Sequence, residues 1–279
     1  MSSEYKIPAQ IHYCWLGGVL PDWVKYYIES WKKFCPDYKI ILWNEDNYDI
    51  YKIPYIAEAA AQKRWAFVSD YARLDVIYQY GGIYLDTDVE LIKSLDDLRK
   101  YEAYVGYGSQ KTINTGLGFG AVAGHPMIGR MLHEYDEVHF VNVDGTLNDQ
   151  PCTIYNTKPY IERGLTQDNT FQMISGVAVL PMEYLSAKDL KTGLVTLTAN
   201  SYSIHQYTCS GHIGYGKQIL EAKQKIRVKF GDEKHSSISK MLIFLVYKYY
   251  GLRYHMEQRD VITKILEKIQ RLRSTKCNY

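Results

Sequence analysis

The sequence lacks the features of a membrane-spanning or a disulfide-stabilised protein. No apolar run approaches the roughly 18 residues that a membrane-spanning helix needs. The opening residues, MSSEYKIPAQ, have neither the basic nor the apolar region of a signal peptide. The five cysteines are scattered and form no C-x-x-C pair, which argues against a disulfide framework and a zinc site. We therefore expect a cytoplasmic protein with reduced thiols.

Net charge is also small, at +2 over 279 residues, but it is unevenly distributed. Residues 216–279 carry a balance of +9, whereas residues 1–215 carry −7. An acidic body and a basic C-terminal segment indicate that the two parts contact different partners, and we expect no nucleic acid among them. The length and the 46% hydrophobic content suit one large domain with an appendage.

The order of the expected elements predicts an α/β fold. The pattern predicts strands over residues 7–15 and 38–43, a helix from about residue 21 to 34, and one long helix over residues 55–80. The long helix ends at Gly81-Gly82, a natural C-cap, before the short apolar strand Ile83–Leu85. Strand–helix–strand–helix–strand predicts a parallel sheet, whose ligands bind at the C-terminal ends of the strands. Further strands are expected within residues 103–108, 114–124, 176–180 and 200–216, and a helix over 125–140.

Three acids accompany an apolar strand in the stretch GGIYLDTDVE, Gly81–Glu90. Acidic groups beside apolar residues are costly unless they are paired, hydrogen-bonded or bound to a cation. If Asp86 and Asp88 continue the strand, their side chains point to the same side at its C-terminal end. Converging carboxylates suit Mg²⁺ or Mn²⁺, whose shell is completed by water and phosphate oxygens, so a diphosphate is the expected companion.

Two other interpretations of these acids stay open. One is a solvated strand-to-loop turn. The other is the carboxylate pair of an inverting glycosidase, because strand spacing would separate the two carboxyls by about 6–7 Å.

Asp70 and Arg73 lie three residues apart on one face of the helix that leads to this strand. Because the helix ends at the Gly-Gly turn, we expect that face to line the same cleft as the acids. A plain ion pair on the helix surface is the other interpretation.

The segment AFVSDYARLDVIYQYGGIYLDTDVEL resembles the signature of the DXD-containing sugar transferases of glycosyltransferase family 32. This family includes bacterial capsular polysaccharide enzymes and yeast initiating mannosyltransferases, and is distantly related to clostridial glucosylating toxins. The resemblance continues through IPAQIHYCWLGG and SWKKFCPDYKIILWNED upstream and through INTGLGFGAVAGHP and YSIHQYTCSG downstream, and so covers residues 7–211. The combined S-D-x-x-R and G-G-x-Y-x-D-x-D pattern is far more specific than D-x-D alone.

The resemblance implies a GT-A fold, a Rossmann-like nucleotide-sugar-binding domain, over residues 1–215. The donor half would span about residues 1–100 and the acceptor half about 101–215, and residues 216–279 would form a basic helical extension. It further implies Mn²⁺ or Mg²⁺, a nucleotide-sugar donor (a UDP-hexose rather than GDP-mannose) and a glycan or lipid-linked glycan acceptor.

The family pattern also assigns roles by position. Asp88 would bind the metal directly, and Asp86 would hold the ribose or a metal-bound water. Asp70 and Arg73 would grip the donor sugar. Asn114 would lie beside the sugar and the acceptor.

Other expected site residues come from both ends of the resemblance. Trp15 would stack near the nucleotide base, and His205 would give a third contact to the metal or the diphosphate. Relatives often have His-His-x-x-x-Ser-Trp in the late block, whereas this chain has His205-Gln206 and then Ser210-Gly211-His212. Without that tryptophan the closing contact to the diphosphate stays open, with His212 either replacing it or facing solvent. The remaining residues expected at the donor site are Leu16, Tyr84, Thr87 and Ser210.

We therefore expect metal-dependent hexosyl transfer, with retention of anomeric configuration and a role in capsular or lipopolysaccharide synthesis implied by the family. Two alternatives stay open. A carboxylate-pair glycoside hydrolase would need neither metal nor nucleotide. An inactive nucleotide- or glycan-binding module would result if the altered late block prevents closure.

The basic C-terminal segment predicts an amphipathic helix. Its apolar face holds Val261, Ile262, Ile265, Ile269 and Leu272, and its basic residues Lys264, Lys268, Arg271 and Arg273 lie largely elsewhere. Such a helix can rest on anionic lipid, so we expect peripheral attachment at the inner face of the cell membrane. A helical cap on the transferase body is the other interpretation.

Overall fold

The computed structural model describes residues 5–190 and 192–208, together with 222–223, 225–226, 229, 238 and 241–246. The chain divides into two compact units, one of Met1–Asp189 and Leu194–Tyr207, the other of Leu190–Gly193 and Thr208–Tyr279. The strands of the described residues all lie in the first unit. The predicted boundary at residue 215 stays a prediction. None of the described helices is both long and apolar enough to cross a bilayer.

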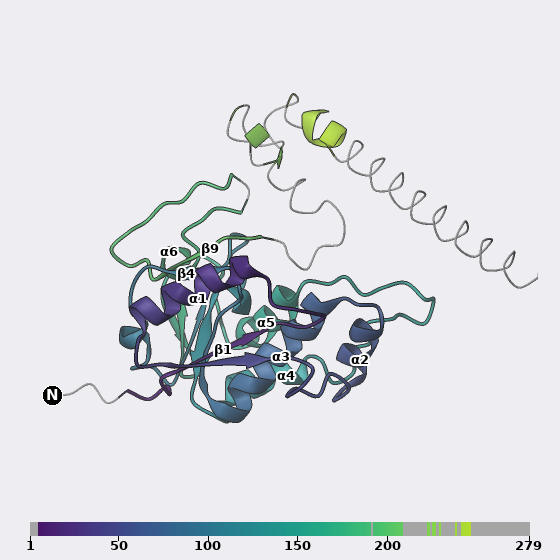
Figure 1. The fold of residues 1–279 in the computed structure, drawn as a ribbon, viewed down its shortest axis with the longest axis horizontal. Helices are drawn as coiled ribbons and strands as arrows, with labels where there is room; N and C mark the ends of the chain where they lie inside the picture. Colours follow the sequence, from purple (N-terminus) through teal and green to yellow (C-terminus); the bar gives the residue numbers. More distant parts are fainter. Residues whose placement is uncertain are drawn as a thin grey trace, which may run out of the picture. The chain divides into compact units, whose positions relative to one another are not determined.

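A seven-stranded mixed sheet forms the centre of the first unit (Figure 1). Its strands lie in the order β2-β1-β3-β6-β5-β8-β7. β1 pairs in parallel with both β2 and β3, as the sequence predicts, whereas β6 runs antiparallel to β3 and β5, and β7 antiparallel to β8. The predicted α/β fold class is thereby confirmed. The strands of this sheet are β1 (Gln10–Cys14), β2 (Lys39–Trp43), β3 (Gly82–Tyr84), β5 (Ala103–Gly106), β6 (Phe119–Ala121), β7 (Gln172–Ile174) and β8 (Val177–Leu180).

A second, two-stranded sheet joins two segments far apart in the sequence. It pairs β4 (Val89–Leu91) antiparallel with β9 (Ser203–His205), so that Val89 lies opposite His205. This pairing brings the late block of the sequence beside the acidic turn.

Helices pack against the central sheet: α1 (Asp22–Phe34), α2 (Pro54–Ala61), α3 (Trp65–Tyr80), α4 (Pro126–His133), α5 (Cys152–Ile161) and α6 (Met182–Leu185). The predicted α1 is confirmed, but the single helix predicted over residues 55–80 is wrong. The chain breaks between α2 and α3, where Lys63 has a left-handed φ of 55° and the Arg64 N–H donates to the Ala59 carbonyl. This is a helix-ending turn of the Schellman type without its usual glycine, so composition and periodicity do not reveal it. The helix predicted over 125–140 ends at His133.

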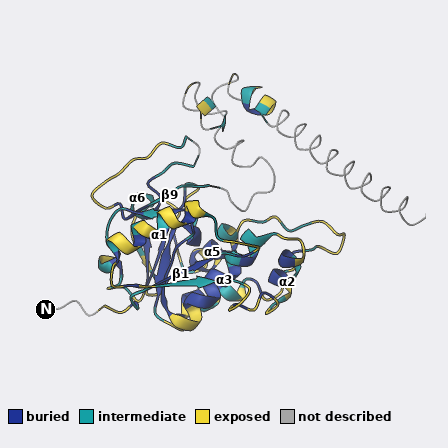
Figure 2. Cartoon of the chain, in the orientation of Figure 1, coloured by how far each residue is buried: buried dark blue, intermediate teal, exposed yellow. Residues whose placement is uncertain are grey.

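Two hydrophobic clusters cover the two faces of the sheet because side chains alternate along each strand. Ala103 and Val105 belong to the cluster that packs against α2–α5, whereas Tyr104 belongs to the cluster with α1. Within the second cluster the fully buried Trp31 of α1 donates its indole N–H to the Val89 carbonyl at 2.8 Å. Figure 2 shows buried residues along the central strands and in α3, and exposed residues on the outer side of α1. The packing therefore fixes both the helix α3 and the small sheet that carry the polar cluster described next.

Candidate active site

The acidic turn is the centre of the candidate site. β3 ends at Tyr84, and the Asp86 carbonyl accepts the Val89 N–H at 3.0 Å, so Asp86-Thr87-Asp88 forms a turn rather than the strand that the sequence predicts. The convergence of the two carboxylates therefore comes from this turn and not from strand alternation. It stands at the C-terminal end of β3, beside the end of β1, as expected for a ligand site of a parallel arrangement.

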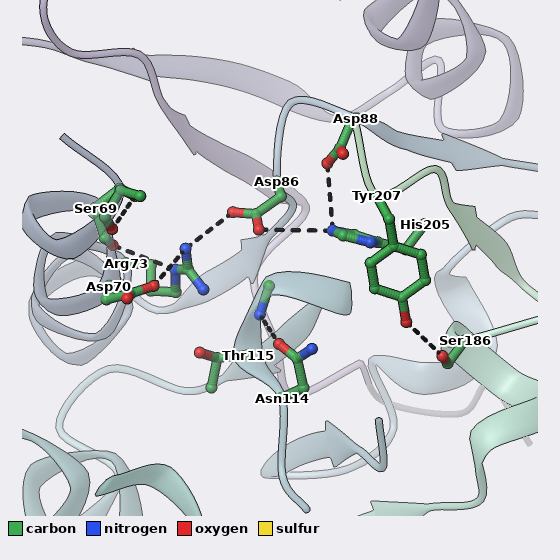
Figure 3. Close-up of polar contacts among 12 residues, drawn as sticks. Ser69, Asp70, Arg73, Asp86, Asp88, Asn114, Thr115, Ser186, His205 and Tyr207 are labelled. Atoms are coloured by element: carbon green, nitrogen blue, oxygen red, sulfur yellow. Dashed lines mark hydrogen bonds and ion pairs between the residues drawn. The ribbon is translucent and has the colours of Figure 1, made fainter. Parts of the chain in front are cut away.

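His205 completes a three-residue cluster with Asp86 and Asp88. Its Nε2 lies 3.2 Å from Asp88 Oδ1 and 3.7 Å from Asp86 Oδ2 (Figure 3). One ligand atom from each of the three residues lies within 4.8 Å of the others. Two carboxylates and an imidazole form a donor set that fits a divalent cation. The structure thus brings together the three residues predicted as metal ligands.

Arg73 connects this cluster to α3. Its Nη2 lies 3.0 Å from Asp70 Oδ1 and 3.2 Å from Asp86 Oδ1, and its Nε donates to the Ser69 carbonyl. The Arg73 side chain is only 6% exposed, and its guanidinium stands over the buried ring of Tyr84 at 5.2 Å. The Asp70–Arg73 pair is therefore buried and joined to Asp86, and is not a surface ion pair.

These contacts shift the pKa values of the charged groups. Burial raises the pKa of Asp86, but Arg73 and then His205 outweigh it, so the pKa is lowered overall. Burial dominates at Asp70, whose pKa is raised in spite of Arg73. At His205 burial lowers the pKa, yet Asp88 and Asp86 outweigh it and raise the pKa above its usual value. The contacts with Arg73 and His205 thus favour the ionised form of Asp86.

A short loop, Asn114–Leu117, lies against another side of the cluster. Asn114 caps the 3₁₀ turn Thr115–Leu117, because its Oδ1 accepts the Gly116 N–H at 2.9 Å. A side chain at Gly116 would place its Cβ 2.4 Å from Asp86 Oδ2 and 3.1 Å from Arg73 Nη1. The loop therefore lies against the cluster, and the place of Asn114 beside the sugar and the acceptor stays a prediction. It is held from α5, where the fully buried Asn156 donates to Thr115 Oγ1 at 2.9 Å.

The remaining predicted residues lie in different surroundings. Thr87 is buried in the acidic turn, and the buried Tyr84 lies behind Arg73. Trp15 and Leu16 follow β1, and no hydrogen bond or ring contact within the described residues joins either to Asp86. Trp15 meets Trp23 edge to face at 5.8 Å, whereas the Leu16 side chain packs into the core. Ser210 and His212 lie outside the described residues.

Three neighbours of the cluster escaped the sequence reasoning. Cys152, at the start of α5, interacts with Asp70, and its thiol helps to lower the pKa of that carboxyl. Gly116 leaves the space that Asp86 occupies. The Tyr207 ring packs on His205. Only Gly116 had a signal in the sequence, as one of the glycines of NTGLGFG; the other two are brought in by tertiary contacts.

The comparison with known families is consistent with this geometry. Residues 21–105 match the family described as "Glycosyltransferase sugar-binding region containing DXD motif". Residues 21–105 therefore resemble a DXD-type sugar-binding region. The match includes the Asp70–Arg73 helix and the turn with both aspartates, but not Asn114 or His205.

Two curated proteins similar to part of this chain are named as sugar transferases. Inositol phosphoceramide mannosyltransferase 3 of Schizosaccharomyces pombe is 32% identical over 142 residues, which is 44% of this chain and 35% of the relative. Alpha-1,4-N-acetylglucosaminyltransferase of Homo sapiens is 31% identical over 80 residues, covering 28% of this chain and 22% of the relative. The chain thus matches about a third or less of the length of these two relatives.

Two solved structures align with this chain at low sequence identity and low TM-score. PaToxG glycosyltransferase aligns with a TM-score of 0.40 and 16% identity, over 56% of this chain and 68% of that one. The galactosyltransferase LgtC, solved with donor and acceptor sugar analogues, aligns with a TM-score of 0.39 and 13% identity, over 77% of this chain and 95% of that one.

Proposed function

We propose that the protein transfers a hexose from a nucleotide-sugar donor to a glycan or lipid-linked glycan acceptor, with the help of a divalent cation. The observation that carries the proposal is the convergence of Asp86, Asp88 and His205 beside the Arg73–Asp70 pair. The mixture of carboxylate and imidazole donors suits Mn²⁺ better than Mg²⁺, which prefers oxygen ligands alone. In this proposal Asp88, Asp86 and His205 hold the cation.

The other side chains act on the donor. When the glycosidic bond breaks, negative charge develops on the leaving diphosphate, and a bound divalent cation stabilises that charge electrostatically. Arg73 Nη1 makes no hydrogen bond to other described residues, so its N–H groups can donate to the sugar or to the diphosphate. Asp70, held by Arg73, is oriented to accept hydrogen bonds from sugar hydroxyls. Asn114 stands where it can contact the sugar from the opposite loop.

The finer parts of the proposal rest on the names of the relatives and on the family resemblance. Among relatives, the names inositol phosphoceramide mannosyltransferase and alpha-1,4-N-acetylglucosaminyltransferase favour a hexose or hexosamine donor and, in the first case, a lipid acceptor. Retention of anomeric configuration, a UDP-linked sugar and a role in capsule or lipopolysaccharide synthesis rest on the family resemblance.

A thermal-shift screen tests the donor and the metal together. UDP- and GDP-linked hexoses are added with and without Mn²⁺, because a ligand that binds only the native state raises the melting temperature. We expect one nucleotide sugar to stabilise the protein in a Mn²⁺-dependent way, and Asp88→Asn to abolish that dependence. Nucleotide release from that donor should stop when EDTA is added. Full release in EDTA would refute the metal-dependent mechanism.

The geometry disfavours an inverting glycoside hydrolase. An inverting hydrolase separates its carboxyl groups by about 6.5–9.5 Å to leave room for water. Oxygens of Asp86 and Asp88 lie within 4.8 Å of each other and face the same imidazole. This arrangement suits cation binding rather than general acid and base groups on two sides of a sugar.

We further propose peripheral attachment to an anionic membrane through the C-terminal segment. Its basic residues Lys264, Lys268, Arg271 and Arg273 lie outside the described residues, so the proposal rests on the +9 balance of residues 216–279. Each basic group near an anionic surface contributes about 1 kcal/mol. Sedimentation with anionic liposomes should therefore occur at low salt, decline at high salt and disappear on charge reversal at these four positions. A protein that stays in the supernatant at low salt would favour the helical cap.

A further inference from the structure

One ring nitrogen of His205 has no hydrogen-bond partner among the described residues. Nε2 faces Asp86 and Asp88, whereas Nδ1 is buried and makes no hydrogen bond to the described residues. Histidines that bind metals usually donate from their second nitrogen to a carboxylate or a carbonyl, which fixes the ring orientation. A different contact must therefore hold the His205 ring in its direction.

The ring of Tyr207 supplies such a contact. It meets the imidazole edge to face, with ring centroids 4.2 Å apart and an interplanar angle of 69°. Its hydroxyl is hydrogen-bonded to Ser186 Oγ at 3.0 Å, and Ser186 is only 5% exposed just after α6. Figure 3 shows the tyrosine between His205 and Ser186. The His205 imidazole thus packs against the Tyr207 ring, whose hydroxyl is itself held by Ser186.

The backbone is bent to make this contact. Tyr207 has a φ of 53°, a left-handed conformation that is unfavourable for a residue with a side chain. Gln206, between the two rings, donates its backbone N–H to the Asp88 carbonyl at 2.9 Å, and its side chain bonds to both Glu90 and Lys188. Because Gln206 is held to β4 and to Lys188, the left-handed turn at Tyr207 places the tyrosine ring against His205. Strain retained beside a cluster of ligand groups points to a role in that cluster.

We propose that Tyr207 is a positioning residue, anchored by Ser186, that orients the His205 imidazole toward the divalent cation. The inference rests on the proposed function, because it assumes that the cluster binds a cation. Tyr207 takes the place of the hydrogen bond that Nδ1 lacks. Tyr207 contacts His205 and would act through it, without being a ligand of the cation itself.

The experiment measures Mn²⁺ affinity directly, from the free Mn²⁺ signal in electron paramagnetic resonance, with full-length protein. The variants are Tyr207→Leu, which removes the aromatic edge, and Tyr207→Phe and Ser186→Ala, which remove only the anchor. Tyr101→Leu is the matched control, since Tyr101 also makes one ring contact, with Phe171, but no contact with the cluster. Melting temperature without Mn²⁺ is measured for each.

We expect Tyr207→Leu to raise the dissociation constant for Mn²⁺ at least fivefold, and the two anchor variants to raise it about two- to threefold. The control should bind like wild type even if its melting temperature falls. Wild-type affinity in all three site variants would overturn the inference while leaving the proposed function intact. Failure of the wild type to bind Mn²⁺ would overturn both.

Discussion

Replacing Gly116 by alanine tests whether the site needs the space beside Asp86. The added Cβ would lie 2.4 Å from Asp86 Oδ2 and 3.2 Å from Asn114 Oδ1, where ordinary contact begins at 3.4 Å. Asp86 Oδ2 and the new Cβ must therefore move apart by about 1 Å, and overpacking of this kind costs about 1–3 kcal/mol. The Asp86 side chain is 25% exposed and can rotate away, so we expect a loss of stability at the lower end, about 1 kcal/mol.

The effect on activity should be larger than the effect on stability. Rotation of Asp86 takes its oxygens away from Arg73 Nη2 at 3.2 Å and from His205 Nε2 at 3.7 Å. A misplacement of about 1 Å at a reacting centre can cost about a hundredfold in rate. We expect Gly116→Ala to lower nucleotide release from the donor by ten- to a hundredfold, and to weaken the Mn²⁺-dependent thermal shift.

Gly129→Ala is the matched control. Gly129 lies in α4, where a Cβ would meet the Tyr78 ring at 3.1 Å and none of the residues of the acidic turn is among its nearest atoms. Tyr78 is 38% exposed and its ring can give way, and alanine favours a helix by about 1 kcal/mol over glycine. Activity of this variant should match wild type. Equal activity and equal Mn²⁺ response in Gly116→Ala would refute the assignment of Asp86 to the site.

Three further predictions concern α3, β1 and the link between α2 and α3. Arg73→Lys should reduce nucleotide release, and should lower the free energy of unfolding in urea by about 1–3 kcal/mol. The reason is that an ammonium cannot bridge Asp70 and Asp86 as the buried guanidinium does. Normal kinetics with only a loss of stability would make Arg73 structural. Burial lowers the pKa of His12 to about 4. Below about pH 6.5 His12 is therefore protonated in the unfolded state but stays neutral in the folded state until the pH approaches 4. The free energy of unfolding should fall by about 2 kcal/mol from pH 7.5 to 5. Urea unfolding of His12→Gln should show a flatter pH dependence, and an unchanged slope would exclude His12 as its source. Lys63→Gly should raise the melting temperature slightly, because glycine adopts the left-handed φ of 55° without strain; a lowered melting temperature would show that the lysine side chain contributes more than the strain costs.

The first three strands and the site helix could be predicted because their signals are local. Alternation and apolar runs mark β1, β2 and β3, and Gly81, with a φ of 66°, ends α3 where the sequence predicts. The Asp70–Arg73 spacing is a helical i,i+3 relation, so its geometry follows once the helix is recognised.

Other features depend on contacts that the local sequence does not encode. The break at Lys63 lacks the glycine that usually marks it. The acidic turn was expected as a strand, because the pattern of Leu85 to Val89 does not show that β4 leaves the central sheet to pair with β9. Cys152 reaches Asp70 only through the packing of α5, and the family resemblance rather than the residue pattern pointed to His205.

The charges of the cluster give a physical reason for its arrangement. Three carboxylates, those of Asp70, Asp86 and Asp88, meet one guanidinium and one imidazole, and with a neutral imidazole these groups leave a formal excess of two negative charges. Such an excess in a largely buried region is costly. Burial raises the pKa of Asp70, and the carboxylates of Asp88 and Asp86 raise the pKa of His205 in spite of its burial. A divalent cation would neutralise the excess and allow His205 to bind through Nε2 with its proton on Nδ1. The same excess makes an isolated diphosphate a poor ligand, because its oxygens would face carboxylates. Cation and nucleotide sugar should therefore bind with positive coupling, each raising the affinity for the other by the same factor.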